Sequence, residues 1–521
     1  MRGFRTWLFT ALLFGAVAPA NAEWWEARTD HFIVYSESSS SDAQNFALDL
    51  ERFDGALRML QNVKFSPVAS DAQRLTVYRF GDVDDIGRLA GSSGVAGFYI
   101  PRIGGSVAFT PARSERIGGG GSIIRRDKRT DLDPRSVLRH EYAHHFMFQH
   151  FSAAYPSWYI EGFAETAATI DLKDDGSFHV GNPPQYRSDA IFSPMMTLSP
   201  STMLTSTSRP DFLDVYGHYT VGWLLNHYLS FGGERPGQLT NYLSLINRGA
   251  DSATAARQAF GDLNKLDRDV IRYRNSRRLG GADVRPTNYT PPRVTMRKLN
   301  ADEEAIMNVE MRVKRGVNRK KARDVAADAR AVAARYPQSV DVNLSLAEAE
   351  LAAQNFAQAE RAIDLALAAQ PNSVPAMLIK GEIYLERGEK EKQYLPNART
   401  WFAKAYAADR NHPGSLFYNY LTYFESGGAI PETALVGLER AFQMAPYETG
   451  VRLVLARQLL AEKKGMLARD ILQPVVLNAH ESKDGKVLTD VVKLIDARKD
   501  AEAYAKLAAQ LEKWEKEAEE G

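Results

Sequence analysis

The sequence predicts an α+β front part followed by an all-α back part. Residues 32–35 and 75–80 have the apolar runs and alternation that are typical of short strands. Residues 43–60, between them, carry apolar side chains at helical spacing. From about residue 301 onward the chain is rich in Ala, Leu, Glu, Lys and Arg, with helical periodicity almost throughout. The length of 521 residues favours two or three domains.

Changes in composition divide the chain into four segments. We expect a leader at residues 1–22, an α+β domain at 23–275, a linker at 276–300 and a helical domain at 301–521. The linker segment is rich in Arg, Gly and Pro and includes the pair Pro291-Pro292, as is typical of a domain boundary.

The first 22 residues have the pattern of a secretory signal peptide. Arg2 and Arg5 precede an apolar run at residues 7–18, and Ala-Asn-Ala at 20–22 is a small-x-small cleavage site. The apolar run is too short for a spanning helix. We therefore expect export to the periplasm or the medium, with a mature chain that starts near Glu23; an uncleaved anchor is the alternative.

Composition excludes several functions. The chain has no Cys, which rules out disulfides, a lipid anchor on Cys and thiolate metal ligands. Removing the leader leaves 63 basic and 64 acidic residues, a net charge of about −1. The net charge therefore gives no overall electrostatic field that would favour binding to nucleic acid or to an anionic membrane. No later stretch is apolar enough to span a bilayer, so we expect no transmembrane segment after signal removal.

The remaining front segments are short strands, loops and helices. Residues 99–100 and 106–110 read as strands, and the Gly-rich residues 117–122 as a flexible connection, because no Gly-Lys-Ser/Thr follows as in a phosphate loop. Residues 171–211 are rich in Ser, Pro, Asp and Gly and predict loops. A helix is expected at residues 214–229.

A helix is also predicted immediately after Asp133. Asp133 is a suitable N-cap, and Pro134 follows at the first helical position, where its missing N–H costs nothing. Residues 135–149 contain no Gly or Pro that would interrupt the helix.

This helix contains His-Glu-x-x-His. His140 and His144 are four residues apart, so both imidazoles point the same way and can bind one metal ion. Glu141 would flank that ion and can accept a proton from a water molecule.

A second helix, opened by Pro156, offers a third ligand. It places Glu161 sixteen residues beyond His144. Three protein ligands leave a fourth position open, which is the arrangement of a catalytic zinc site. Glu165, one helical turn after Glu161, is the alternative third ligand.

These two segments resemble the gluzincin zinc metallopeptidases. Residues 158–165, Trp-Tyr-Ile-Glu-Gly-Phe-Ala-Glu, look like the Trp-x-x-Glu-Gly-x-Ala signature of aminopeptidase N-type enzymes, and more closely like small bacterial peptidase MA-like domains. The resemblance implies one Zn²⁺ per chain, with His140, His144 and Glu161 as ligands and Glu141 as general base. It also implies a small mixed sheet ahead of the active-site helices.

The resemblance assigns further roles. Glu165 would orient a ligating His from outside the ligand set. Tyr216, near the start of the downstream helix, would stabilise the oxyanion, with His218 and Tyr219 as alternatives. Residues 106–110 would be the edge strand that pairs with the substrate backbone, or else an internal strand.

No Gly-x-Met-Glu-Asn-type run precedes His140. This departure from aminopeptidase N speaks against exopeptidase action, although the sequence leaves endo- and exopeptidase action open.

The back part resembles tetratricopeptide repeats. Pro337 and Pro371 are 34 residues apart, and Pro413 and Pro446 are 33 apart, with small residues at the expected helix crossings. We expect four or five helix pairs stacked as a solenoid. Its concave surface would bind a peptide or protein partner, or the repeats would serve only as a spacer.

Two functions follow from these patterns. The first is an exported zinc-dependent metallopeptidase that hydrolyses a peptide or protein substrate through a metal-activated water. The second is a catalytically silent envelope scaffold that binds protein partners through its repeats.

Overall fold

A six-stranded mixed sheet forms the centre of the front part. In this computed structural model, which describes residues 23–93, 95–113, 133–193, 198–205, 212–276, 279–477 and 485–520, the strand order is β4-β5-β3-β2-β1-β9. Strands β2, β3 and β5 run parallel, whereas β4, β1 and β9 are antiparallel to their neighbours. The strands are β1 (Trp24–Arg28), β2 (Phe32–Glu37), β3 (Leu75–Arg79), β4 (Phe98–Ile100), β5 (Val107–Thr110) and β9 (Thr295–Lys298). The predicted leader and the Gly-rich segment at 117–122 lie outside the described residues.

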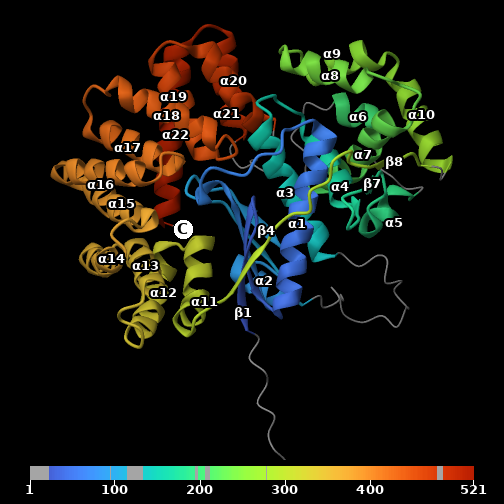
Figure 1. The fold of residues 1–521 in the computed structure, drawn as a ribbon. Coiled ribbons are helices and arrows are strands. Elements are labelled where there is room, and N and C mark those ends of the chain that lie inside the picture. Colours follow the sequence, from blue (N-terminus) through green and yellow to red (C-terminus); the bar gives the residue numbers. More distant parts are fainter. Residues whose placement is uncertain are drawn as a thin grey trace, which may run out of the picture.

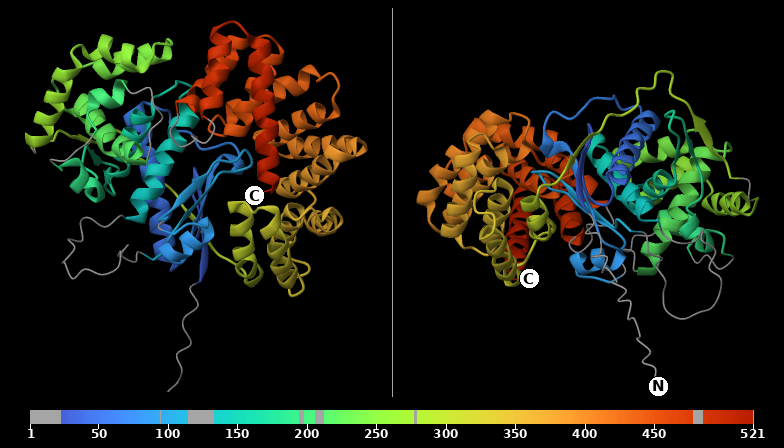
Figure 2. Two further views of the ribbon diagram at one scale, coloured as in Figure 1. Left: turned by 180° about the vertical axis from the view of Figure 1, so that it is seen from behind. Right: turned by 60° about the horizontal axis from the view of Figure 1, so that its bottom comes forward.

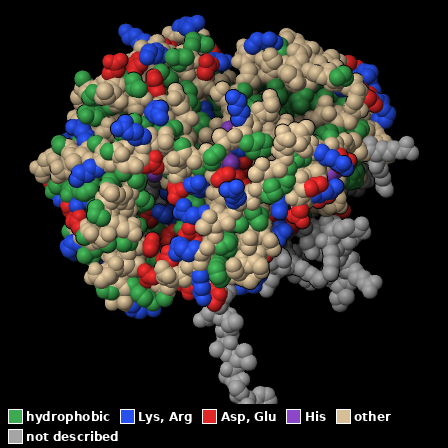
Figure 3. All heavy atoms as spheres, viewed as in Figure 1, with side chains coloured by type: hydrophobic (Ala, Val, Ile, Leu, Met, Phe, Trp, Pro, Cys, Tyr) green, Lys and Arg blue, Asp and Glu red, His purple; other side chains and the backbone are tan. Residues whose placement is uncertain are grey.

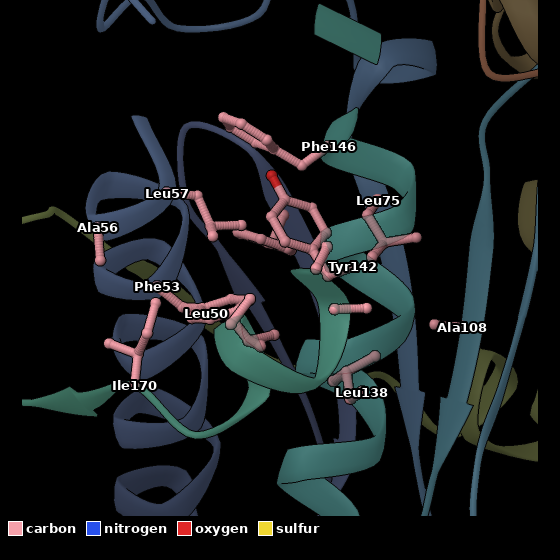
Figure 4. Packing of buried hydrophobic residues seen from close by; sticks show 14 of the residues in the cluster. Leu50, Phe53, Ala56, Leu57, Leu75, Ala108, Leu138, Tyr142, Phe146 and Ile170 are labelled. Atoms are coloured by element: carbon pink, nitrogen blue, oxygen red, sulfur yellow. The ribbon is translucent and has the colours of Figure 1, made fainter. Parts of the chain in front are cut away.

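Helices cover both faces of this sheet. Because side chains alternate along a strand, Val77 and Ala108 face α1 (Ser40–Gln61) and α3 (Pro134–His150), whereas Tyr78 and Phe109 face the opposite side. Figure 4 shows the first face, where Leu138, Tyr142 and Phe146 of α3 meet Leu50, Phe53 and Leu57 of α1. The opposite face is covered by α2 (Val83–Ala90) and by α11 (Ala301–Arg315) of the back part. Helix α3 is therefore fixed against the sheet along its length.

The structure decides two assignments made from the sequence. Strand β5 lies within residues 106–110, which were expected to form either an edge strand or an internal strand; it is internal, because it pairs with β3 on one side and β4 on the other and all four of its residues are buried. The edge strand next to α3 is β4 instead. The predicted linker at 276–300 carries two strands, β8 (Ala282–Val284) and β9, and each pairs with a strand of the front part. The alternating stretch at 294–299 is short, and three of the four residues of β9 are exposed, so the pattern was weak.

A helical layer with a small second sheet completes the front part. The sheet has the order β6-β7-β8, formed by Asp171–Leu172, Phe178–Val180 and Ala282–Val284. Part of the segment predicted as loops at 171–211 is thus a hairpin, a 3-10 helix and two short α-helices. The helices of this layer are α4 (Ser157–Ala168), α5 (Ser188–Ile191), α6 (Pro200–Thr205), α7 (Phe212–Phe231), α8 (Gln238–Asn247), α9 (Ser252–Phe260) and α10 (Leu263–Ser276).

The back part is helical throughout its described residues, as predicted. Successive helices pack side by side into an arc, which begins beside the sheet and returns to the top of α3 (Figures 1 and 2). Each of the four prolines used to recognise the repeats lies in the turn before a helix or at its first position; they are Pro337, Pro371, Pro413 and Pro446. After α11 the helices are α12 (Arg319–Ala333), α13 (Val340–Ala352), α14 (Phe356–Ala369), α15 (Val374–Lys390), α16 (Leu395–Ala408), α17 (Pro413–Ser426), α18 (Glu432–Met444), α19 (Thr449–Ala461), α20 (Gly465–Val476), α21 (Gly485–Asp496) and α22 (Asp500–Glu520).

The turn between β4 and β5 lies inside this arc. Arg102 donates a hydrogen bond to the carbonyl oxygen of Lys314 at the end of α11 (2.7 Å). Ile103, 5% exposed, belongs to the apolar cluster formed by α17–α22. The two parts are thereby joined at both ends of the arc. Among the described residues, no helix is both long and apolar enough to cross a membrane.

Candidate metal centre and active site

Helix α3 presents two imidazoles side by side. Its N-cap Asp133 accepts a hydrogen bond from the backbone N–H of Arg135, and Pro134 is its first residue, as predicted. The four-residue spacing brings the Nε2 atoms of His140 and His144 to 3.1 Å from one another. The two rings are nearly perpendicular, with an interplanar angle of 86°.

Helix α4 adds a carboxylate to this pair. Oε2 of Glu161 lies 3.3 Å from Nε2 of His140 and 3.6 Å from Nε2 of His144. Three ligands bound to one tetrahedral Zn²⁺ at ordinary bond lengths would be about 3.3 Å apart. The three separations are thus close to those of a zinc ligand set. The donor atoms are two imidazole nitrogens and one carboxylate oxygen, which also suits zinc.

The three side chains are almost fully buried. His140, His144 and Glu161 are 7%, 6% and 2% exposed. Burial lowers the pKa of His140, but its hydrogen bond with Glu161 and the negative charges of Glu165, Glu161 and Glu141 outweigh burial, so the pKa is raised. A proton therefore competes with a cation for this imidazole, and cation binding should strengthen as pH rises.

Glu165 occupies a different place from Glu161. Its Oε1 lies 3.8 Å from Nδ1 of His140, on the side of the ring away from the donor cluster. The Glu165 carboxylate accepts hydrogen bonds from the Tyr186 hydroxyl (2.5 Å) and from Nε of Arg187 (2.7 Å). These geometries favour Glu161 as the third ligand and leave Glu165 behind His140.

Tyr186 and Arg187 were not singled out from the sequence. They belong to a short 3-10 helix, Gln185–Arg187, inside the segment predicted as loops. No motif marks them, and only the fold brings them to Glu165. Arg187 also lies over the ring of Tyr219, with its Cζ 4.4 Å from the ring centroid.

Close packing of α4 and α7 brings Tyr219 to the site. A Cβ atom on Gly162 would lie 2.5 Å from the carbonyl oxygen of Gly222, and one on Gly222 would lie 2.6 Å from that of Trp158. Only glycine allows this backbone approach. The Tyr219 ring centroid consequently lies 5.7 Å from that of His140.

Tyr219 is thus an aromatic residue whose ring packs beside His140 of the donor cluster. Burial and the nearby charges of Glu161 and Glu141 raise its pKa, which keeps the phenol protonated and able to donate a hydrogen bond. The side chain of Tyr216, the first choice from the sequence, lies outside the described residues. His218 points to Ser157, with its Nδ1 3.1 Å from the hydroxyl oxygen.

Glu141 faces a cavity that opens beside the cluster. It is half-buried, and with His144 it lines a cavity of about 220 Å³. The face in Figure 3 shows histidine side chains near its centre, between the front part and the helical arc. His145 is packed rather than exposed, and burial lowers its pKa to about 3.

A second group of metal-ligand types is satisfied by hydrogen bonds. His31, Glu51 and Asp54 offer donor atoms within 4.8 Å of one another. However, Nδ1 of His31 lies 2.5 Å from Glu51 and its Nε2 lies 3.0 Å from the carbonyl oxygen of Ser66, so both ring nitrogens donate. Asp54 accepts from Arg58 and from Tyr142. This group is a buried ion network, and it leaves no imidazole lone pair for a metal.

Comparison with known proteins adds no relative. No family model, curated protein or solved structure matches the chain.

Proposed function

We propose that this chain is an exported zinc-dependent metallopeptidase of the gluzincin type, joined to a tetratricopeptide-repeat domain. The observation that carries the proposal is the convergence of His140, His144 and Glu161, whose three donor atoms lie 3.1, 3.3 and 3.6 Å apart. A Zn²⁺ ion held by these three side chains would supply a Lewis acid and would lower the pKa of water.

The chain's own groups supply the proton transfers. The Glu141 carboxylate accepts a proton from the attacking water and passes it to the leaving amine nitrogen. The protonated phenol of Tyr219 donates a hydrogen bond to the oxygen that becomes negative as the scissile carbonyl is attacked. Glu165, held by Tyr186 and Arg187, fixes the orientation of the His140 ring through its charge.

The position of the β4–β5 turn favours the peptidase over the silent scaffold. A scaffold would use the concave surface of the repeats for its partner. That surface already contacts the front part through Arg102 and Ile103. The front part therefore already occupies part of the surface that a partner of the scaffold would need.

Hydrolysis of unfolded casein tests the proposal. Wild-type protein loaded with one equivalent of zinc should cleave casein, and a chelator should stop cleavage. Glu141→Gln should retain zinc but lose at least about 10²-fold in rate, because the proton acceptor is gone and the ligands remain.

Glu502→Gln is the matched control, since this carboxylate is exposed and lies on α22. It should leave the rate unchanged. Full activity of zinc-loaded Glu141→Gln would refute the mechanism, and absence of cleavage by zinc-loaded wild type across varied substrates would favour the scaffold.

A further inference from the structure

We propose that the helical arc forms one wall of a substrate side-chain pocket, so that the repeats help to select a large apolar or aromatic residue next to the bond that is cut. The inference rests on the proposed function and deepens it. It assigns α19 and α20 to the specificity site although they lie some 300 residues from α3 in the sequence.

The pocket is the cavity of about 220 Å³ that Glu141 and His144 line. Its front wall also includes Tyr99 of the edge strand β4 and Phe148 of α3. A group in this cavity would therefore be next to the proposed proton acceptor and to one proposed ligand.

The opposite wall belongs to the back part. Pro446 and Tyr447 from the turn before α19, Thr449 at its start and Val475 of α20 line the same cavity. Figures 1 and 2 show the end of the arc, α19–α21, beside α3. The repeats thus complete a pocket that the front part leaves open.

Specific contacts hold this wall in place. The Tyr447 ring packs on His145, with centroids 4.4 Å apart, and the Tyr99 hydroxyl lies 2.7 Å from Nδ1 of His145. Arg452, 4% exposed, donates hydrogen bonds to the carbonyl oxygens of Pro446 (2.5 Å) and Ile471 (2.9 Å), which ties the turn to α20. The wall is therefore fixed to α3 and to its own helices.

The size and surface of the pocket indicate its occupant. A dry cavity of about 150 Å³ with apolar walls accommodates benzene, so this larger one can hold an aromatic ring. Rings and aliphatic groups of Tyr99, Phe148, Pro446, Tyr447 and Val475 supply most of its walls. A large apolar side chain would replace water there and gain from burial.

Binding to the Glu141→Gln protein tests the pocket without catalysis. The probes are two fluorescein-labelled peptides of Ala, Gly and Ser that differ only in one central residue, Phe or Ala. Fluorescence anisotropy should give about tenfold tighter binding of the Phe peptide, the effect of burying one aromatic side chain. Cleavage-site mapping by mass spectrometry on zinc-loaded wild type should show the same preference.

Thr449→Trp fills the pocket from the repeat side. Thr449 is half-buried at the first position of α19, so the larger side chain can enter the cavity without rebuilding a core. We expect it to abolish the preference for Phe while zinc content and melting temperature stay unchanged. Val436→Trp, at a position 56% exposed on α18, is the matched control and should keep the preference.

The outcomes separate the two claims. Equal binding of the Phe and Ala peptides, or an unchanged preference in a folded Thr449→Trp protein, would overturn the pocket even if wild type cleaves peptides. A preference that Thr449→Trp removes would support the pocket even if wild type hydrolyses nothing, in which case only the proposed function falls.

Discussion

Glu161 and Glu165 lie one helical turn apart, yet their side chains contact different groups. Oε2 of Glu161 faces the Nε2 atoms of both histidines. Both oxygens of Glu165 are engaged by Tyr186 and Arg187. A carboxylate already held by a guanidinium and a phenol is a poor ligand but a good fixed charge, so position along the helix decides which residue can bind a cation.

The proposed role of the Tyr219 hydroxyl can be tested by removing that hydroxyl. Tyr219→Phe should lower kcat by about 10²–10³ with zinc content unchanged, because one oxyanion donor is lost and no ligand is touched. Steady-state kinetics with a fluorogenic peptide, together with metal analysis, measure both quantities. Tyr216→Phe is the comparison: a loss of rate in that variant with normal activity of Tyr219→Phe would restore the assignment made from the sequence.

The ion network around His31 predicts a pH-dependent stability. Burial lowers the pKa of His31, but its hydrogen bond to Glu51 and the charges of Asp54 and Glu51 raise it above 6.5 overall. The pKa of Glu51 falls below 4.5, because hydrogen bonding to His31 and its charge outweigh burial. The raised pKa of His31 stabilises the folded state below pH 6.5, and this stabilisation is lost as the pH rises through the pKa of His31 in the folded protein. The lowered pKa of Glu51 stabilises the folded state above pH 4.5, and this stabilisation is lost as the pH falls through the pKa of Glu51 in the folded protein.

Urea unfolding of His31→Gln against wild type measures this contribution. The difference in free energy of unfolding should be greatest between about pH 4.5 and 6.5 and should shrink on both sides. His179→Gln, which removes a more exposed ion pair with Asp283, is the comparison and should show a smaller difference. A difference that does not vary with pH would contradict the ion network.

At the scale of elements, contact between α4 and α7 sets the geometry of the site. Helix α4 carries Glu161 and α7 carries Tyr219, and the pair Gly162 and Gly222 lets their backbones meet. Helices α3 and α4, which carry the candidate ligands, were predictable from Asp133, Pro134 and Pro156 because caps act within one turn. The contact with α7 was not, since nothing near Gly162 in the sequence identifies its partner.

An added methyl group tests this contact. Gly162→Ala would place Cβ 2.5 Å from the Gly222 carbonyl oxygen, so the helices must separate. We expect a loss of about 1–3 kcal/mol in stability, and weaker zinc binding as Glu161 moves. Thermal unfolding and zinc titration report the two effects. Gly428→Ala, where no atom lies within 4 Å of the added Cβ, should change neither.

Short strands show the limit of local patterns. Strand β5 has four residues, and the sequence predicted a strand there but left edge and internal positions open, because neighbours in a sheet come from distant segments. Strand β9 lay inside the predicted linker because a mostly exposed four-residue strand resembles a polar connection.

At the scale of the whole molecule, the helical arc and the front part share apolar cores at both ends. Leu299, Met307 and Met311 cover one face of the sheet, and Ile103 enters the cluster of α17–α22. Helical periodicity and proline spacing predicted the helices of the back part. They could not predict this docking, which depends on residues hundreds of positions apart.

A charge placed at the distal contact tests the docking. Ile103→Asp would bury a carboxylate among apolar side chains, and we expect it to lower the free energy of unfolding by about 3 kcal/mol or more. Urea unfolding measures the loss. Phe65→Asp, at an apolar residue 63% exposed, is the control and should be nearly neutral. Equal stability of the two variants would show that the turn does not dock in solution.

A crystal structure of the zinc-loaded protein, with data collected at the zinc absorption edge, addresses the central claim most directly. We predict one anomalous peak per chain, about 2.0–2.2 Å from Nε2 of His140, Nε2 of His144 and a carboxylate oxygen of Glu161. A peak at His31, Glu51 and Asp54 instead, or none at one equivalent of zinc, would contradict the account.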